Sequence, residues 1–143
     1  MKIVIAADHG GYNIKQAIIS ALSTEGHIVE DLGTNDGETS VDYPVYAKAL
    51  CKKLQQAEAE LGILCCGTGI GMSMTANKQK GIRAAVLSDA FSAEMTRRHN
   101  NANVLCLGGR VLSEEQAVSL AKLFVSTPFE GGRHQRRIDM MED

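Results

Sequence analysis

Short apolar runs that alternate with helix-like segments are the feature of this sequence that most restricts its fold. Five runs are apolar enough to form buried strands: Lys2–Ala7, His27–Leu32, Leu61–Cys66, Ile82–Leu87 and Asn103–Leu107. Between them, apolar residues recur at helical spacing in two groups: Ile14, Ile18, Ala21 and Leu22, then Tyr46, Leu50, Leu54 and Ala57. Nearly continuous apolar strands separated by helices predict an α/β fold whose parallel sheet is covered by helices on both faces.

The second half of the chain continues the same pattern. Ser113 and Gln116 have the spacing of a capping box, which predicts a helix that runs to about Val125 and is stopped by Pro128. Parallel strands are joined by right-handed crossovers, and ligands bind at the carboxyl ends of the strands. The residues that follow each strand are therefore the first place to look for a functional site.

Composition narrows the function classes. The 143 residues fit one domain, spanning 1–143, with no linker, repeat or low-complexity tract. With 15 Lys and Arg against 17 Asp and Glu, the net charge of −2 argues against nucleic-acid and membrane partners. The first apolar run stops at Asp8, too early for a signal peptide, and no run approaches membrane-spanning length, so we expect a cytoplasmic protein.

The four cysteines show no pattern of disulfide or zinc binding. Cys51, Cys65, Cys66 and Cys106 form no C-x-x-C pair and have no histidine at zinc-ligand spacing. We therefore expect reduced thiols, no metal site and no cofactor.

Polar and glycine-rich segments follow four of the predicted strands. These are Asp8-His9-Gly10-Gly11, Cys66-Gly67-Thr68-Gly69-Ile70-Gly71, Ser88-Asp89 and Gly108-Gly109-Arg110. A glycine turn that opens a helix is suited to an anion, because unpaired backbone N–H groups and the helix dipole point the same way. We expect a negatively charged ligand at this edge of the sheet.

A nucleotide phosphate is the first alternative for that ligand. Gly67, Gly69 and Gly71 spell G-x-G-x-G, but Met72 takes the place of the third glycine of the dinucleotide fingerprint G-x-G-x-x-G, and no Lys-Ser/Thr pair follows as in a P-loop. A non-enzymatic nucleotide-binding module remains a weak alternative, which thermal-shift screening with ATP and with sugar phosphates would separate from an enzyme.

A reactive thiol is the second alternative, and Cys66 is the candidate. A thiolate beside a helix N-terminus has a lowered pKa, and the same amides can stabilise an oxyanion on a substrate, so Cys66 could be a base or a nucleophile. The other three cysteines are better explained as small buried residues. Thr68 could equally serve its own loop amides, and Asp8 could be a helix cap.

His99 is expected to lie far from Cys66 in its own chain. The helix that starts near Ala90 begins at the edge where Cys66 lies and runs back to the edge where the strand Asn103–Leu107 begins. If His99 works with Cys66, a second subunit must supply one of the two.

Six motifs in this order resemble a known enzyme family over essentially the whole chain. They are AADHGG at 6–11, VDYPVYA at 41–47, CGTGIGMSMTANK at 66–78, GIRAA at 81–85, HNNANVLCLGGR at 99–110 and TPFEGGRHQRRI at 127–138. The chain is similar to the type B ribose-5-phosphate isomerases, a family that includes galactose-6-phosphate and allose-6-phosphate isomerases. The resemblance implies a three-layer α/β/α sandwich with a Rossmann-like five-stranded parallel sheet. It also implies a homodimer or tetramer with active sites at subunit contacts.

The resemblance also implies a role for each matching residue. Cys66 would be the base that moves a proton between C1 and C2 of the open-chain sugar, and His99 would open the sugar ring. The loop Gly67, Thr68, Gly69, Ile70 and Gly71 would hold the enediolate oxygen, with Thr68 among the catalytic groups. Sugar hydroxyls or phosphate would be held by Asp8, His9 and Asn100, and phosphate by Arg110, Arg133 and Arg137.

Two positions and the substrate stay open. Some family members use a carboxylate near this loop as the base, whereas this chain has the cysteine. Cys65 stands where a plain apolar residue is expected, and Arg136 receives no role. Ribose 5-phosphate is favoured, and allose 6-phosphate and galactose 6-phosphate are the alternatives.

Overall fold

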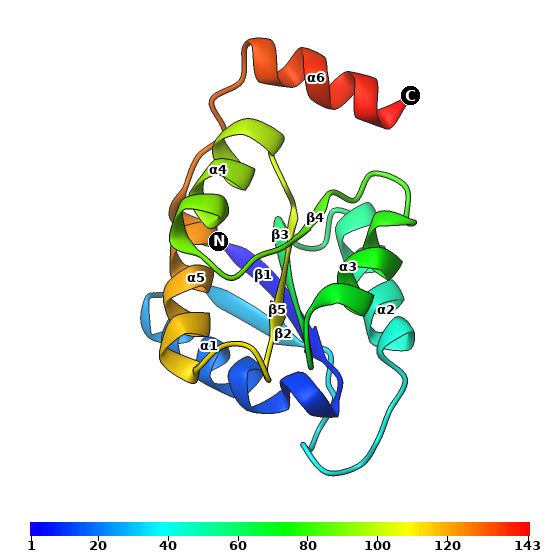
Figure 1. Ribbon diagram of the computed structural model, residues 1–143, viewed down its shortest axis with the longest axis vertical. Coiled ribbons are helices and arrows are strands. Elements are labelled where there is room, and N and C mark those ends of the chain that lie inside the picture. Colours follow the sequence, from blue (N-terminus) through cyan, green and yellow to red (C-terminus); the bar gives the residue numbers. More distant parts are fainter.

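Five parallel strands form one sheet in the computed structural model, which describes all residues from Met1 to Asp143 (Figure 1). The strands are β1 (Lys2–Ala7), β2 (Ile28–Asp31), β3 (Leu61–Cys66), β4 (Ala84–Val86) and β5 (Val104–Gly108). Their order across the sheet is β2-β1-β3-β5-β4, and every neighbouring pair is parallel. The predicted α/β class with a parallel five-stranded sheet is confirmed.

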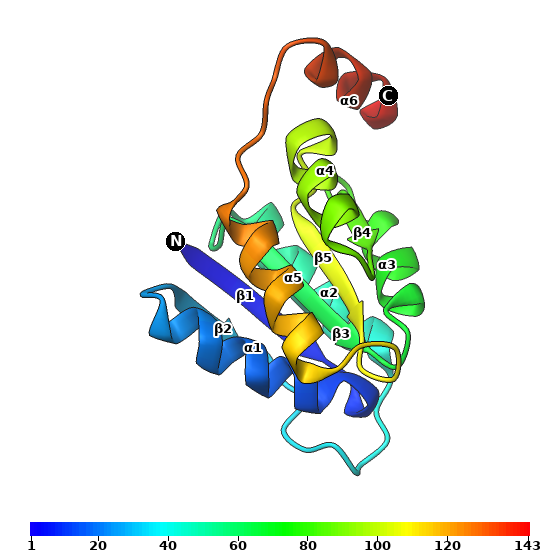
Figure 2. The same ribbon diagram turned by 60° about the vertical axis from the view of Figure 1, so that its left-hand side comes forward.

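Helices cover both faces of this sheet. They are η1 (His9–Gly11, a 3₁₀ turn), α1 (Tyr12–Thr24), α2 (Tyr43–Gln55), α3 (Ile70–Asn77), α4 (Ala90–Asn100), α5 (Glu114–Ser126) and α6 (Arg133–Glu142). Helix α5 packs against both α1 and α4 on one face, and α2 packs against α3 on the other (Figure 2). The three-layer sandwich is therefore confirmed as well.

Each strand sends alternate side chains into two separate hydrophobic cores. Ile3, Ile5 and Cys65 belong to the core under α1 and α5. Val4 and Cys66 belong to the smaller core under α2 and α3. Since successive strand residues point to opposite faces, the two adjacent thiols are separated by the sheet, and only Cys66 can serve a site on the α2 and α3 side.

Three predicted boundaries were too generous. The run Ile82–Leu87 yields only Ala84–Val86 as β4, because the amides of Arg83 and Ala84 are taken by the side chains of Asn103 and Asn77, both at 2.8 Å. The run His27–Leu32 yields Ile28–Asp31 as β2, the other edge strand. Ala57 lies beyond the end of α2, with a positive φ of 57°.

The capping box of α5 is present as predicted. Gln116 N donates to Ser113 Oγ at 3.1 Å, and Ser113 N donates to Gln116 Oε1 at 2.9 Å. The helix ends at Ser126, two residues before Pro128. None of the helices combines the length and hydrophobicity that crossing a lipid bilayer would require.

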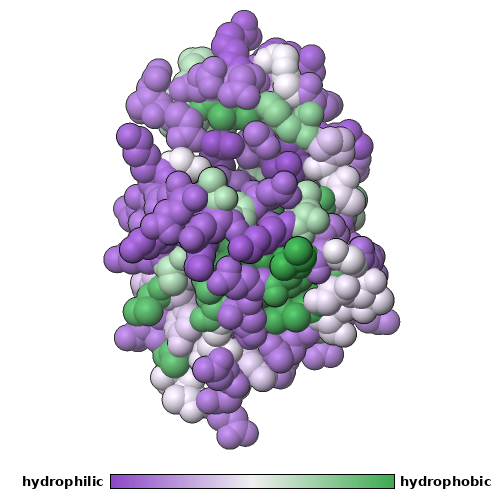
Figure 3. All heavy atoms as spheres, turned by 180° about the vertical axis from the view of Figure 1, so that it is seen from behind, coloured by the Kyte–Doolittle hydropathy of each residue, from purple (hydrophilic) through white to green (hydrophobic).

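Helix α6 lies at one end of the molecule and contacts α4 (Figures 1 and 2). Only two of its side chains, His134 and Ile138, are buried, while Arg133, Arg136 and Arg137 are exposed. From behind, hydrophilic side chains dominate this end of the molecule, and hydrophobic ones gather nearer its middle (Figure 3). The helix thus has one narrow buried face and a basic exposed surface.

A buried ion pair fastens α1 to the edge strand β2. The Lys15 side chain is 1% exposed, and its Nζ lies 2.8 and 2.9 Å from the two carboxylate oxygens of Asp31. Lys15 Nζ also donates to Gln16 Oε1, and Asp31 accepts from the Gly33 amide. The lysine is thus tolerated in the interior because its charge is paired and hydrogen-bonded.

Removal of Asp31 should cost more stability than removal of Lys15. Asp31→Ala leaves a buried ammonium without its counter-charge, and we expect a loss of about 3 kcal/mol in the free energy of unfolding, at the low end of the range because Asp31 is partly exposed. Lys15→Met removes the buried positive charge itself and leaves only the partly exposed Asp31 carboxylate unpaired, so it should cost less than about 1 kcal/mol in the free energy of unfolding. Urea unfolding of both variants measures the difference, and equal losses would contradict this account of the pair.

Candidate active site

A pocket of about 450 Å³ lies at the carboxyl edge of the sheet. It is lined by Asp8, Tyr43, Cys66, Gly67, Thr68, Ile70, Gly71, Met74 and Arg110. Asp8 follows β1, the loop 67–69 follows β3, and Arg110 follows β5, so three central strands deliver their next residues to one place. Three of the four polar segments expected at this edge meet in the pocket, whereas Ser88-Asp89, which follows the edge strand β4, does not line it.

The Cys66 thiol faces the start of α3. Gly69 N donates to Cys66 Sγ at 3.1 Å, and Cys66 is only 5% exposed. Gly69 can make this contact because its φ of 81° lies in the left-handed region that other residues avoid, and it is also the N-cap of α3. A thiolate at this sulfur would be stabilised by that amide and by the positive end of the helix.

Two other glycines of the loop make room for side chains of the pocket wall. A Cβ on Gly67 would lie 3.1 Å from Arg110 Nη1, and one on Gly71 would lie 2.5 Å from the Tyr43 ring. Because the glycines lack a Cβ, the Arg110 guanidinium can lie over the loop and the Tyr43 ring can pack against α3. The glycines therefore bring a cation and an aromatic wall to the thiol.

Asp8 and Thr68 line the pocket and also have structural roles. Asp8 Oδ1 accepts from the Gly10 amide at 2.9 Å and caps η1, while the residue is 7% exposed. Thr68 Oγ1 accepts from the Ile70 amide at 3.2 Å. The capping roles considered for both residues are present in the structure, in addition to their places in the pocket wall.

His9 lies on η1, next to the pocket wall rather than in it. Its Nδ1 accepts from the Val41 amide at 3.3 Å. Because this nitrogen is an acceptor, the neutral ring carries its proton on Nε2. His9 is therefore set up as a donor from Nε2.

The remaining four predicted residues lie at the opposite end of the chain's fold. His99 and Asn100 are the last residues of α4, close to the edge where β5 begins, and Arg133 and Arg137 lie on α6 beyond them (Figure 1). The Asn100 carbonyl accepts from Arg83 Nε at 3.0 Å. One chain thus carries the candidate residues around Cys66 at one end and those around His99 at the other. The direction of the strands predicts this separation for His99.

His99 is part of a compact cluster with Glu130 and His134. The rings of His99 and His134 stack with centroids 4.2 Å apart and planes 11° apart. Glu130 Oε1 lies 3.6 Å from His99 Nε2 and 3.7 Å from His134 Nε2. Imidazole lone pairs lie in the ring plane, so two parallel rings aim them side by side rather than at one ion about 2 Å away. The stacked rings therefore do not suit joint coordination of one metal ion.

The other three cysteines are shielded from reaction. Burial raises the pKa of the Cys51 thiol to about 11 and also raises the pKa values of Cys65 and Cys106. All three are fully buried in the cores. They stay protonated and act as small apolar residues, as expected from the sequence.

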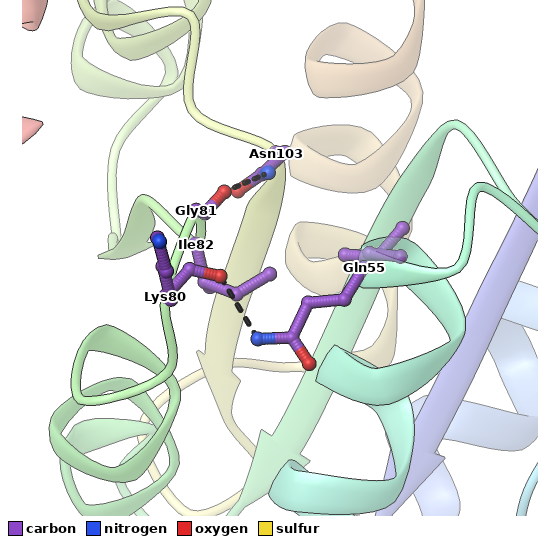
Figure 4. Close-up of a pocket in the computed structure, with 6 residues that line it drawn as sticks. Gln55, Lys80, Gly81, Ile82 and Asn103 are labelled. Atoms are coloured by element: carbon purple, nitrogen blue, oxygen red, sulfur yellow. Dashed lines mark hydrogen bonds between the residues drawn. The ribbon is translucent and has the colours of Figure 1, made fainter.

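A second pocket, of about 360 Å³, lies near the opposite edge of the sheet between the end of α2 and the segment before β4 (Figure 4). Gln55 Nε2 donates to the Lys80 carbonyl at 2.9 Å, and Asn103 Nδ2 donates to the Gly81 carbonyl at 3.0 Å. These amides serve the backbone of the turn, and Lys80 is the only titratable residue of the wall. This second pocket therefore offers no group of reactive side chains comparable to that around Cys66.

Comparison with known proteins identifies the family. The sequence matches the family model described as Ribose/Galactose Isomerase over residues 3–141. The chain belongs to this family. The resemblance inferred from the six motifs is thereby confirmed.

Relatives of this family align over nearly their whole length. A putative sugar phosphate isomerase of Bacillus subtilis is 47% identical over 143 residues, covering 100% of this chain and 96% of the relative. Ribose-5-phosphate isomerase B of Escherichia coli is 42% identical over 138 residues, covering 96% and 92%.

Solved structures agree with this fold closely. A ribose 5-phosphate isomerase of Thermotoga maritima superimposes with a TM-score of 0.95 at 48% identity, covering 99% of this chain and 97% of that one. Ribose-5-phosphate isomerase B of Mycoplasma genitalium, with bound ribulose-5-phosphate, gives 0.93 at 42% identity, covering 99% and 93%.

Sequence reasoning missed four residues that the structure brings to these two places. Tyr43 and Met74 line the Cys66 pocket, and Glu130 and His134 surround His99. Tyr43, Met74, Glu130 and His134 all fall within motifs of the family resemblance. That membership was the signal that could have singled them out.

Among the four cysteines, Cys66 should be alkylated first. It lines an open pocket beside a helix N-terminus, whereas burial keeps the other three as neutral thiols. Brief treatment with iodoacetamide at neutral pH, followed by peptide mass spectrometry, should label Cys66 at least about 10-fold faster than Cys65. Equal labelling of Cys65 and Cys66 in the folded protein would contradict this placement of the two thiols.

Proposed function

We propose that this protein is an aldose–ketose isomerase that interconverts ribose 5-phosphate and ribulose 5-phosphate. The observation that carries the proposal is the Cys66 thiol, held 3.1 Å from the Gly69 amide inside the pocket at the carboxyl edge of the sheet. Membership of the isomerase family supports it, as does the relative with bound ribulose-5-phosphate. Four free thiols are typical of a protein in the reducing cytoplasm, where we propose that this enzyme acts.

The central step is a proton transfer between two carbons. The Cys66 thiolate takes the proton from C2 of the open-chain aldose, and the electron pair moves to the carbonyl, which gives an enediolate with its charge on O1. Amides of the loop Gly67 to Gly71 and the α3 dipole stabilise this charge. Cys66 then returns its proton to C1 while the O2 proton moves to O1, so that C2 and O2 form the carbonyl of the ketose and the thiolate is regenerated. Thr68 lies beside O1 in this arrangement.

Ring opening precedes this step and requires a second subunit. His99 lies at the end of the fold opposite to Cys66, so His99 of the partner subunit would act at each site. The proton of the C1 hydroxyl passes through the imidazole to the ring oxygen as the bond between C1 and that oxygen breaks, so the histidine ends in its starting state. We therefore propose a homodimer, or a tetramer built from such dimers.

Binding groups come from both chains in this scheme. Arg110, over the loop at Gly67, and Asp8 and His9 come from the chain that supplies Cys66. Asn100, Arg133 and Arg137 come from the partner with His99. Planar guanidinium groups suit a phosphate because they form paired, charge-assisted hydrogen bonds. The proposed steps use only these side chains and backbone amides.

A coupled isomerase assay tests the function directly. The substrates are ribose 5-phosphate, allose 6-phosphate and galactose 6-phosphate, without added metal. Turnover of ribose 5-phosphate with the highest kcat/KM is the expected result. Higher kcat/KM with a hexose phosphate would assign the protein to that branch of the family, and no turnover of any of the three would overturn the proposal.

Removal of the proposed base should abolish isomerisation. Cys66→Ala should lower kcat by at least about 10²–10⁴-fold, the usual cost of losing a general base. Cys65→Ala is the matched control, because that thiol faces the other core and should leave most activity. Near-normal turnover by Cys66→Ala would contradict its role as the base.

The exposed arginines of α6 should differ in their effect on substrate binding. Arg133 and Arg137 are four residues apart on one side of α6, whereas Arg136 faces directly away from the buried His134 and Ile138. Arg137→Ala should raise KM by about 10–100-fold, the equivalent of one charge-assisted phosphate contact. Arg136→Ala should leave KM within about 2-fold. Equal effects would show that the wrong side of α6 has been assigned to the phosphate.

A further inference from the structure

We propose that Glu130 and His134 are positioning residues for His99, and that the three side chains form a unit which carries at most one imidazolium charge and fixes the orientation of the His99 ring. This inference rests on the proposed function, in which His99 opens the sugar ring. It adds two residues to that step and states what each does.

The shared carboxylate oxygen is the first observation. The same atom, Glu130 Oε1, lies 3.6 Å from His99 Nε2 and 3.7 Å from His134 Nε2. An imidazole that carries its proton on Nε2 is favoured beside a carboxylate, which accepts hydrogen bonds and donates none when ionised. The negative charge of Glu130 therefore favours the His99 tautomer that carries its proton on Nε2. The nitrogen left to meet a sugar hydroxyl as a proton acceptor is Nδ1.

The stacking of the two rings is the second observation. With centroids 4.2 Å apart and planes 11° apart, the His134 ring covers one face of the His99 ring. His134 is 7% exposed, whereas the His99 side chain is 41% exposed. The buried ring is therefore the support, and the exposed ring is the one that can reach a ligand.

The backbone holds the cluster together from both sides. Glu130 N donates to the Arg98 carbonyl at 3.1 Å, which joins the segment before α6 to the last turn of α4. Glu130 lies in the segment just before α6 and His134 in the first turn of α6, so the short turn through Gly131 and Gly132 brings the carboxylate to the supporting ring. His99 is thus fixed relative to two residues of the C-terminal segment.

The charges around the cluster allow one of the two histidines to be an imidazolium, but not both at once. Glu130 faces both rings, the α6 residues Arg133 and Arg137 act on His134, and Arg98 on α4 is paired with Glu94 at 2.9 Å. Two imidazolium ions stacked at 4.2 Å would repel each other, and one carboxylate offsets only one of them. In agreement, burial and then the charges of His99 and Arg133 lower the pKa of His134, with Glu130 acting in the opposite direction.

Proton NMR titration of the imidazole signals tests this unit without any substrate. The chain has four histidines, His9, His27, His99 and His134, so each signal can be assigned with single His→Gln variants. Glu130→Gln removes the negative charge next to the two rings, so the midpoint of the His99 titration should be lower in this variant than in the wild-type protein. Glu94→Gln, which removes a carboxylate from the same helix as His99 but on its Arg98 side, is the control and should leave the midpoint unchanged.

A second variant tests the coupling between the rings. In the wild-type protein the signals of His99 and His134 should titrate in two shared steps, as interacting groups do. In His134→Gln the His99 signal should titrate in one step. Independent single-step titrations in the wild-type protein, or a His99 midpoint that Glu130→Gln leaves in place, would overturn the proposal.

Kinetics connect the unit to ring opening. The pH profile of kcat for ribose 5-phosphate should move to lower pH in Glu130→Gln, together with the NMR midpoint. In Glu130→Asp, which keeps a carboxylate, the profile should lie close to that of the wild-type protein. A fall in kcat with an unmoved pH profile would show a merely structural role and contradict the proposal. If the proposed function itself is wrong, the wild-type protein will lack isomerase activity while the shared titration is still observed.

Discussion

The direction of the chain in a parallel sheet determines where every candidate residue lies. All five strands run the same way, so the residues that follow them meet at one edge, and the helices return the chain to the other. Cys66, Asp8 and Arg110 therefore share a pocket, whereas His99, Asn100 and α6 lie at the far end. Within one chain, the proposed base Cys66 is therefore separated from the proposed ring-opening residue His99. The proposed site is completed by a second copy of the chain.

Within the pocket, the chemistry depends on a short stretch of backbone that lacks side chains. The positive φ of Gly69 turns its amide toward the Cys66 sulfur, and the missing Cβ atoms of Gly67 and Gly71 admit Arg110 and Tyr43. Any larger residue at Gly71 would collide with the Tyr43 ring, and a left-handed backbone at position 69 disfavours other residues. The glycines thus place an amide, a cation and an aromatic wall around one thiol.

Much of this arrangement could be predicted from the sequence, because it depends on local patterns. The strands Lys2–Ala7 and Leu61–Cys66 lie between two others and are buried along their length, so their apolar runs mark their bounds correctly. The edge strand β4 was overestimated, and at its N-terminal end the amides of Arg83 and Ala84 donate to the side chains of Asn103 and Asn77, contacts that spacing does not show.

Contacts between distant segments account for what the sequence analysis missed. Tyr43 meets Gly71 across 28 positions of the chain, and Glu130 meets His99 across 31, so neither pair leaves a periodic signal. The opposite placement of His99 and Cys66 was predictable, because it follows from strand direction alone. The partners of His99 were not, because they depend on how the segment before α6 crosses the end of α4.

Subunit complementation tests the shared site most directly. Cys66→Ala and His99→Ala homodimers should each be nearly inactive, since each lacks one group at every site. A purified heterodimer of the two variants carries one site with both Cys66 and His99 intact, and it should show up to about half of the wild-type activity. Subunit exchange is verified first, for example with differently tagged chains. If the verified heterodimer then shows no recovery of activity, both residues act within one chain and the account is contradicted.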